Sequence, residues 1–146
     1  MNIKPYGKAA DAEIEAFENQ VKFTLPQDYK QFLMEYNGGS VLGIFHVNTL
    51  NEDISLHVLF GLGIDEELDL RSWFSEYKDD MLPYTVIIGG DMGAGLIVLL
   101  NSPKKQGVYY WDHSYYFKES SDERNIYKIA NSFQEFVDNL KTPAPE

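Results

Sequence analysis

Two short runs of apolar residues stand close together in the second half of the chain. They are Thr85-Val86-Ile87-Ile88 and Leu96-Ile97-Val98-Leu99-Leu100, and the glycine-rich residues 89–95 separate them. Continuous apolar runs of this length are typical of strands that are buried on both faces. The whole stretch from Val86 to Leu100 is broken by glycines and Asp91 and is too short to cross a bilayer. The pattern therefore predicts two buried strands joined by a loop.

Helical patterns lie at both ends of the chain, and strand patterns fill most of the region between them. Apolar spacing and capping residues predict helices over 11–21, from residues 24–27 onwards, from Asp65 onwards and after Ser132. For the second helix, Pro26 suits the first helical position, and Thr24 is an alternative N-cap. Predicted strands cover 41–47, 57–60, 85–88, 96–100, 107–111 and 126–129.

The order of these patterns favours an α+β fold over regular βαβ alternation. We predict a single domain over residues 1–141, with a mixed, mostly antiparallel sheet flanked by N-terminal and C-terminal helices. A chain of 146 residues is long enough for one core of ordinary size. Residues 142–146 lack an apolar anchor and are expected to form a flexible tail.

Acidic residues outnumber basic ones by 23 to 12, which gives a net charge of -11. Such a chain repels nucleic-acid phosphates and anionic membranes, so neither is expected as a direct partner. A basic protein is the complementary partner, although acidity of this kind also serves solubility alone. Cysteine is absent and residues 1–6 show no apolar signal segment, so we expect a cytoplasmic protein. The oligomeric state is left open.

Residues with catalytic or ligand-binding chemistry form no recognisable motif. The segment Gly89–Gly95 fits neither nucleotide-binding glycine pattern, so we expect a tight turn in which glycines supply positive φ. His46, His57 and His113 lack the short spacing of metal ligands, although His46 could meet His57 across a hairpin. We therefore predict no catalytic, cofactor-binding or metal-ligating residues. A hydrolase that brings two carboxylates together in space is an alternative.

Aromatic residues and acids gather in the second half of the chain. Alternation along strand 107–111 sends Tyr109 and Trp111 to one face and Val108 and Tyr110 to the other. One pair is expected in the core, and the other either in the core or at an interface. The predicted partner-binding residues form two patches that combine aromatic and acidic side chains. The first patch is Asp112, Tyr115, Tyr116, Glu119, Asp122 and Glu123, and the second is Asp65, Glu66 and Asp69.

Four segments resemble the SUKH superfamily, which includes bacterial immunity proteins and the yeast cell-wall-assembly regulators. Residues 25–33 (LPQDYKQFL), leading to Tyr36-Asn37-Gly38-Gly39, resemble its opening signature. Residues 87–91, 108–113 and 129–136 follow in the order of the family. The match covers nearly the whole chain. The sequence is similar to the LXG-toxin immunity proteins of Gram-positive bacteria.

The resemblance implies an α+β fold and a cognate polymorphic toxin as partner, with no catalytic residues. The expected function is stoichiometric capping of the C-terminal domain of that toxin, a basic domain for which nuclease activity is one option. An acidic and aromatic surface would then cover a basic groove in the toxin. The alternative is a regulatory scaffold or interaction protein in cell-envelope or signalling pathways.

Overall fold

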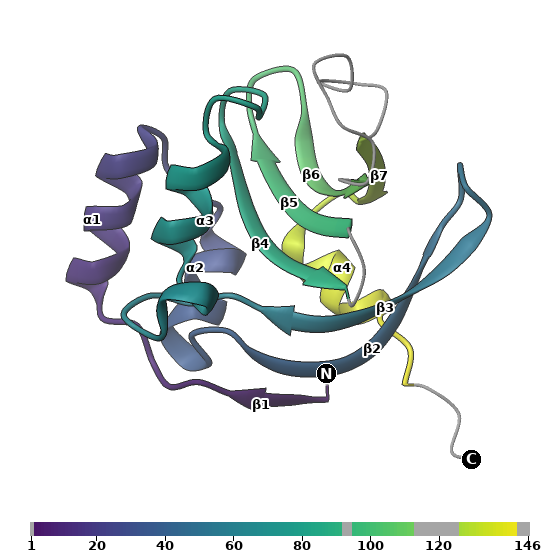
Figure 1. The fold of residues 1–146 in the computed structure, drawn as a ribbon, viewed down its shortest axis with the longest axis horizontal. Helices are drawn as coiled ribbons and strands as arrows, with labels where there is room; N and C mark the ends of the chain where they lie inside the picture. The colour runs from purple at the N-terminus through teal and green to yellow at the C-terminus, as the bar shows by residue number, and fades with distance from the viewer. Residues whose placement is uncertain (1, 92–94, 113–125, 143–146) are drawn as a thin grey trace.

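The computed structural model describes residues 2–91, 95–112 and 126–142. Figure 1 shows helices gathered around one curled sheet. The helices are α1 (Asp11–Val21), α2 (Gln27–Glu35), the 3₁₀ helix η1 (Glu66–Leu68), α3 (Leu70–Tyr77) and α4 (Phe133–Asn139). The strands are β1 (Ile3–Pro5), β2 (Gly39–Val47), β3 (Glu52–Leu59), β4 (Thr85–Asp91), β5 (Gly95–Asn101), β6 (Gln106–Asp112) and β7 (Ile126–Ala130).

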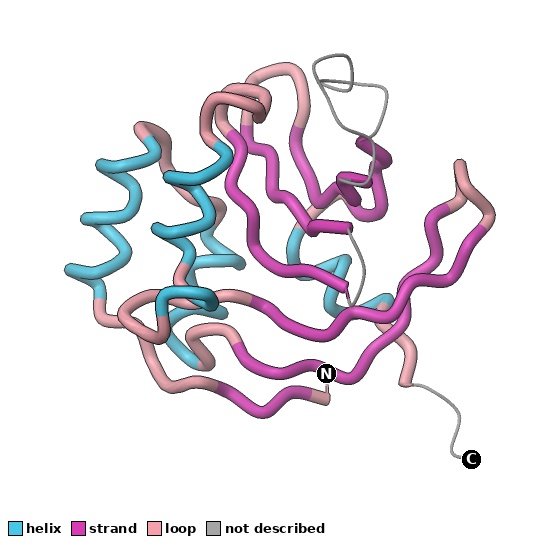
Figure 2. The backbone as a smooth tube through the Cα atoms, viewed as in Figure 1, coloured by secondary structure: helices cyan, strands magenta, loops and turns pink. Residues whose placement is uncertain are grey.

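The strands lie in the sheet in the same order as in the chain, and every pair of neighbours is antiparallel. The predicted single-domain α+β class is confirmed, and the sheet is antiparallel between all of its described strands rather than mixed. β2 and β3 run across the direction of β4–β6, which gives the sheet its curl (Figures 1 and 2). Because of this curl, β2 comes into contact with β7.

β4 and β5 contain the two predicted apolar runs, and they pair as a hairpin with Ile87 opposite Val98. Their side chains are buried along almost the whole length of both strands. Gly89 and Gly90 were expected in the connecting turn with positive φ, but they lie within β4 and do not have positive φ. A Cβ atom at Gly89 would collide with the carbonyl oxygen of Val58, so the glycine permits close approach of β3.

The first two helices begin at or near their predicted positions. α1 has the predicted bounds. α2 begins at Gln27 with Pro26 as its N-cap residue, so both expected starts, with Thr24 as the cap or Pro26 inside the helix, are wrong. The Asp28 carboxylate accepts a hydrogen bond from the Gln134 N–H of α4 at 2.9 Å. α2 thus places a negative charge at the start of the last helix, where the helix dipole favours it.

The third helix begins later than predicted, and the fourth begins as predicted. Asp69 caps α3, so the helix starts at Leu70, and the acids that precede Asp69 form η1 instead. In α4 the Ser132 hydroxyl accepts a hydrogen bond from the Glu135 N–H at 3.0 Å, as the capping pattern predicts. None of the described helices is long and apolar enough to cross a membrane.

Aromatic side chains connect the helices with the sheet. Phe136 of α4 lies over Phe45 of β2, with ring centroids 5.6 Å apart. Phe133 of α4 meets Tyr29 of α2 at 5.0 Å, so α2 and α4 share one part of the core. α1 and α3 lie side by side in Figure 1, and their contact includes an edge-on pair of rings, Phe17 and Phe74. α3 in turn packs on β4.

Several details of the sheet differ from the prediction. In β6 both predicted pairs, Tyr109 with Trp111 and Val108 with Tyr110, are buried, so neither forms an exposed interface. β1 and the first half of β3 are absent from the predicted set, because β1 is very short and residues 52–55 carry mostly exposed side chains.

The chain stays attached to the sheet beyond α4. Lys141 forms an isolated bridge with Ile44 of β2, in which each residue donates its N–H to the carbonyl oxygen of the other. The predicted domain limits, 1–141 with a tail at 142–146, stay a prediction, and residues 143–146 lie outside the described part.

Candidate functional site

The site is built on a corner where the end of α2 meets the end of β3. We call residues 37–39 and 60–62 the α2 corner. Asn37 is buried, and its side chain binds both backbone groups of Leu62: Oδ1 accepts from the N–H and Nδ2 donates to the carbonyl oxygen, each at 2.8 Å. Its φ of 51° suits asparagine, which tolerates the left-handed region better than most residues. A Cβ atom at Gly61 would collide with the Asn37 carbonyl oxygen.

η1 and α3 are attached to this corner through Gly61. The Gly61 N–H donates to the Leu68 carbonyl oxygen at 3.1 Å, and the Leu70 N–H donates to the Gly61 carbonyl oxygen at 2.8 Å. These two bonds bracket the junction between η1 and α3. The position of α3 on the sheet therefore depends on the backbone that Asn37 holds in place.

Asp69 organises the start of α3. Its buried carboxylate accepts hydrogen bonds from the backbone N–H groups of Gly63 and Arg71, both at 2.9 Å. The Arg71 guanidinium donates to the same carboxylate from Nε at 3.0 Å and from Nη2 at 2.8 Å. Burial alone would raise the pKa of Asp69, but the hydrogen bonds and the charge of Arg71 together lower it below its ordinary value.

Four aromatic rings run from the α2 corner across α3 to β6. The Trp73 ring stacks on Phe60, with centroids 4.7 Å apart, and on Tyr77 at 5.8 Å. Tyr77 meets Trp111 edge-on at 6.0 Å. We call these four residues the aromatic row. Phe60 and Trp111 are buried, whereas Trp73 and Tyr77 are half-buried and give the row its exposed surface. The Trp73 Nε1–H donates to the Glu67 carbonyl oxygen at 2.9 Å, which fixes the indole against η1.

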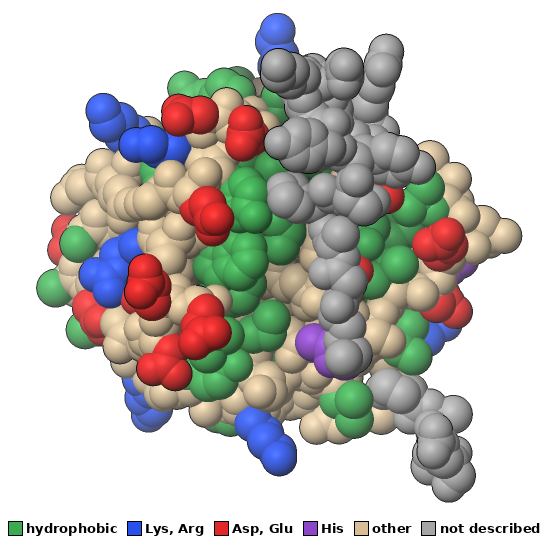
Figure 3. All heavy atoms as spheres, in the orientation of Figure 1, with side chains coloured by type: hydrophobic (Ala, Val, Ile, Leu, Met, Phe, Trp, Pro, Cys, Tyr) green, Lys and Arg blue, Asp and Glu red, His purple; other side chains and the backbone are tan. Residues whose placement is uncertain are grey.

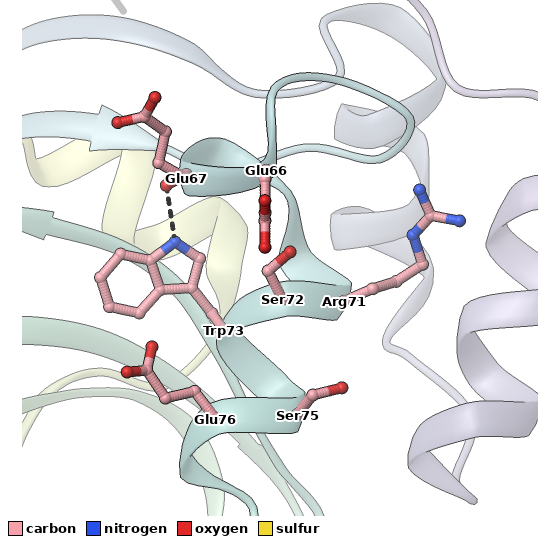
Figure 4. Close-up of a pocket in the computed structure, with 7 residues that line it drawn as sticks. All are labelled: Glu66, Glu67, Arg71, Ser72, Trp73, Ser75 and Glu76. Atoms are coloured by element: carbon pink, nitrogen blue, oxygen red, sulfur yellow. Dashed lines mark hydrogen bonds between the residues drawn. The ribbon is translucent and has the colours of Figure 1, made fainter.

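An open groove of about 830 Å³ lies beside the aromatic row on η1 and α3. We call it the α3 groove and, together with the aromatic row, the α3 face. The residues that line the groove are Glu66, Glu67, Arg71, Ser72, Trp73, Ser75 and Glu76 (Figure 4). Glu66, Glu67 and Glu76 form no ion pair with any residue in the described part of the chain. Arg71 is engaged with Asp69 and points away from them (Figure 4).

The α3 face is therefore acidic around an apolar centre. Figure 3 shows a band of apolar side chains on the side of the molecule that carries α3 and β4, bordered by acidic side chains. Partial burial, followed by the charges of Glu76 and Asp80, raises the pKa of the Tyr77 phenol. Because unpaired carboxylates beside exposed rings attract and desolvate a cationic side chain, this face suits a basic protein partner.

The predicted partner-binding residues are distributed unevenly over this site. Asp65 and Glu66 are exposed beside the α3 groove. Asp69 is buried beneath it and serves α3, so its prediction as a partner-facing acid is wrong. Asp112 ends β6 directly after Trp111, the last ring of the aromatic row. The other five predicted residues, Tyr115, Tyr116, Glu119, Asp122 and Glu123, lie outside the described residues.

Residues of the face that were not predicted as partner-binding include Glu67, Trp73, Glu76 and Tyr77. The sequence signal for the two rings was a Trp–Tyr pair four residues apart with Glu76 directly before Tyr77, but the same spacing also describes a stripe of core residues. The hairpin contact suggested for His46 is wrong, since His46 lies opposite Asp53, 2.8 Å from Nδ1 to Oδ1. His113 lies outside the described residues. No group of three or more potential metal ligands occurs in the part that the structure describes.

A comparison with protein families gives a match over residues 8–139 to the model described as SMI1 / KNR4 family (SUKH-1). The chain belongs to this family. The SUKH-1 match includes both the α2 corner and the whole of the α3 face up to Asp112. The comparison with curated proteins gave no match.

Membership of the SUKH-1 family is consistent with an immunity-protein function and with a toxin as the kind of partner. The family's opening signature coincides with α2 and the α2 corner, and its buried side chains include Tyr29, Phe32, Leu33 and Asn37. These buried residues maintain the fold. The α3 face, by contrast, has the exposure and the charge that a binding surface requires.

Proposed function

We propose that this chain is an immunity protein that binds its cognate polymorphic toxin stoichiometrically and blocks it in the cytoplasm of the producing cell. The partner is the basic C-terminal domain of an LXG-type toxin, for which nuclease activity is one option. Family membership supports the general function, and the net charge of -11 supports a basic partner. The protein acts by covering the toxin, without turnover of a substrate.

The α3 face is the observation that carries this proposal. Its carboxylates at Glu66, Glu67 and Glu76 are solvated and lack ion pairs with described residues, so they can exchange water for cationic side chains of a partner. Trp73 and Tyr77 add half-buried rings of the kind that dominate interface energies. A basic active-site groove laid on this face would lose access to RNA or DNA by exclusion and by charge.

The first predicted patch stays part of the proposal. Asp112 follows Trp111 at the end of β6, and strand alternation turns its side chain to the face of Tyr110, whose pKa its charge helps to raise. Tyr115, Tyr116, Glu119, Asp122 and Glu123 follow it in the sequence and are included in the proposal on their chemistry alone. The second candidate function, a regulatory scaffold in envelope or signalling pathways, uses the same face for a partner that is not a toxin.

Co-expression tests the function directly. The C-terminal domain encoded by the gene next to this one is produced in a sensitive host with and without this chain. An immunity protein restores growth and co-purifies with the domain in equal amounts. A neighbouring domain that is harmless, or a toxic one that this chain neither binds nor neutralises, would leave the regulatory scaffold as the better explanation.

Charge reversal tests the face. The double variant Glu66→Lys/Glu76→Lys is compared with Glu15→Lys/Glu35→Lys, a control at exposed acids of α1 and α2 with the same change in net charge. We expect the Kd for the toxin domain to rise at least about tenfold in the first variant and to change far less in the control. Equal weakening in both would mean that overall charge, and not this face, determines binding.

A further inference from the structure

A second groove, at the far end of α1 and α3, differs in chemistry from the α3 face. It has a volume of about 380 Å³ and lies where the end of α1 meets the connection from α3 to β4. We call it the Tyr84 groove. The side chains that define it are Lys22, Phe23, Lys78, Met81, Leu82 and Tyr84. Its floor and walls are therefore apolar, and its charged lining residues are lysines.

Tyr84 has an unusual combination of exposure and backbone conformation. Its side chain is 45% exposed, and it is one of two large apolar side chains exposed in the described part of the chain. Its φ is 60°, in the left-handed region, which costs a residue other than glycine about 1–2 kcal/mol. The Tyr84 carbonyl oxygen accepts a hydrogen bond from the Asn101 N–H at 3.0 Å.

The fold does not need a tyrosine to make this turn. A carbonyl oxygen is common to all residues, and asparagine or glycine would adopt the same φ at lower cost. What the tyrosine adds is its ring, which stands edge-on to Phe23 with centroids 5.8 Å apart and forms one wall of the groove. Tyr84 therefore places a partly exposed aromatic ring in the wall of the groove, despite its strained backbone.

The lysines give the groove a charge opposite to that of the molecule. Lys22 and Lys78 are exposed, and neither forms an ion pair with a residue that the structure describes. No Asp or Glu lines the groove; Asp79 and Asp80 follow Lys78 in the chain but lie outside the lining. In a chain of net charge -11, two unpaired lysines around an apolar hollow are a local exception.

We propose that the Tyr84 groove binds an acidic amphipathic peptide segment of a partner protein. Apolar side chains of the segment fill the hollow against Phe23 and Tyr84, and its carboxylates pair with Lys22 and Lys78. A nucleic acid or an anionic membrane would bring many negative charges towards a strongly acidic protein, whereas a short segment brings only a few. This surface is separate from the α3 face and does not depend on the function proposed for that face.

Two synthetic peptides of equal length and identical apolar residues test the proposal, one flanked by glutamates and the other by lysines. Backbone amide signals of the ¹⁵N-labelled protein are followed during titration. We expect the glutamate peptide to shift signals from residues 21–24, 78–82, 84 and 85, and the lysine peptide to leave them unchanged. Lys22→Glu/Lys78→Glu is expected to raise the Kd at least about tenfold, whereas Lys4→Glu/Lys8→Glu, at exposed lysines elsewhere, is expected to leave it unchanged.

Tyr84→Asn separates binding from folding. Asparagine accepts the left-handed backbone, so we expect the thermal midpoint to stay the same or rise while peptide binding is lost. Four results would overturn the proposal: no shifts with either peptide, equal shifts with both, shifts centred on the α3 face, or unchanged binding in Tyr84→Asn. Shifts of the groove signals with protein concentration alone would also overturn it, because they would identify a second copy of this chain as the occupant.

Discussion

The α2 corner and the α3 face lie next to each other and use their polar groups in opposite ways. In the corner, both polar atoms of the Asn37 side chain are bonded inside the protein, and Gly61 leaves no room for a side chain. On the face, the carboxylates of Glu66, Glu67 and Glu76 have no ion-pair partner among the described residues. The polar groups of the α2 corner therefore stabilise the fold. The carboxylates of the α3 face are available to bind a partner.

This difference separates the residues that maintain the fold from those that are exposed to a partner. The corner holds η1 and α3 through Gly61, so it determines where the face lies. The side chains of Glu66, Glu67 and Glu76 on the face form no ion pair with described residues, so they can change with little cost to the fold. Substitutions in the corner are therefore expected to affect stability first, whereas substitutions on the face are expected to affect binding first.

The largest expected effect on stability is that of Asn37→Ala. The substitution leaves the buried N–H and carbonyl oxygen of Leu62 without partners and places alanine at a positive φ. We expect the free energy of unfolding to fall by about 4 kcal/mol, measured by urea denaturation. Asn19→Ala, at an exposed asparagine of α1, is the control and should change it by less than about 1 kcal/mol. If Asn37→Ala lowered the free energy of unfolding by no more than the control does, the α2 corner would not have a structural role.

Asp69→Asn tests the junction between the two regions. Asparagine retains the size of the side chain but loses the charge that caps α3 and binds Arg71. We expect a loss of about 2 kcal/mol near neutral pH. Asp65→Asn, at the neighbouring exposed acid, makes no side-chain cap bond and is the matched control, with little change expected.

The pH dependence of this effect has a definite sign. The pKa of Asp69 is lower in the folded protein than its ordinary value, so its stabilisation is fully present above the unfolded pKa of about 4 and is lost as the pH falls through the folded value. The difference between the native protein and Asp69→Asn should therefore be constant from neutral pH down to about pH 5 and shrink below about pH 4. A difference that grows on acidification would contradict the ion-pair role of Asp69.

Much of the fold could be predicted from the sequence because its signals are local. The bounds of α1, the Ser132 cap of α4 and the buried β4–β5 pair all follow from side-chain patterns within a few residues. The start of α3 could not be predicted in this way. Asp65 and Asp69 are equally good capping residues by type. Asp69 caps the helix because the backbone of Gly61 and Gly63 bonds to residues 68–70 in three dimensions.

The site was predictable only in its chemistry. Acids beside aromatics indicated a surface for a basic partner; Glu66 lines the α3 groove, and Asp65 is exposed next to it in the chain. The sequence could not reveal that Asp69 faces inward, or that Trp73 and Tyr77 remain half-buried while Trp111 is covered. The burial of these side chains depends on how α3 packs on the sheet. This packing is a tertiary contact, and the spacing of apolar residues along the sequence does not record it.

The smallest expected effect on stability is that of Tyr29→Phe. This substitution tests a buried hydroxyl in α2 that has no hydrogen-bond partner among the described residues. The ring of Tyr29 is fully buried against Phe32 and Phe133, yet its hydroxyl has no hydrogen-bond partner among the described residues. Burying a hydroxyl without a partner costs free energy, so its removal should leave the free energy of unfolding unchanged or raise it by up to about 1 kcal/mol. Tyr29→Ala, which also removes the ring, should lower it by about 4 kcal/mol. If Tyr29→Phe lowered the free energy of unfolding by more than about 1 kcal/mol, the hydroxyl would have to be hydrogen-bonded in the folded protein. The buried polar groups of α2 would then all be bonded, as those of Asn37 in the α2 corner are.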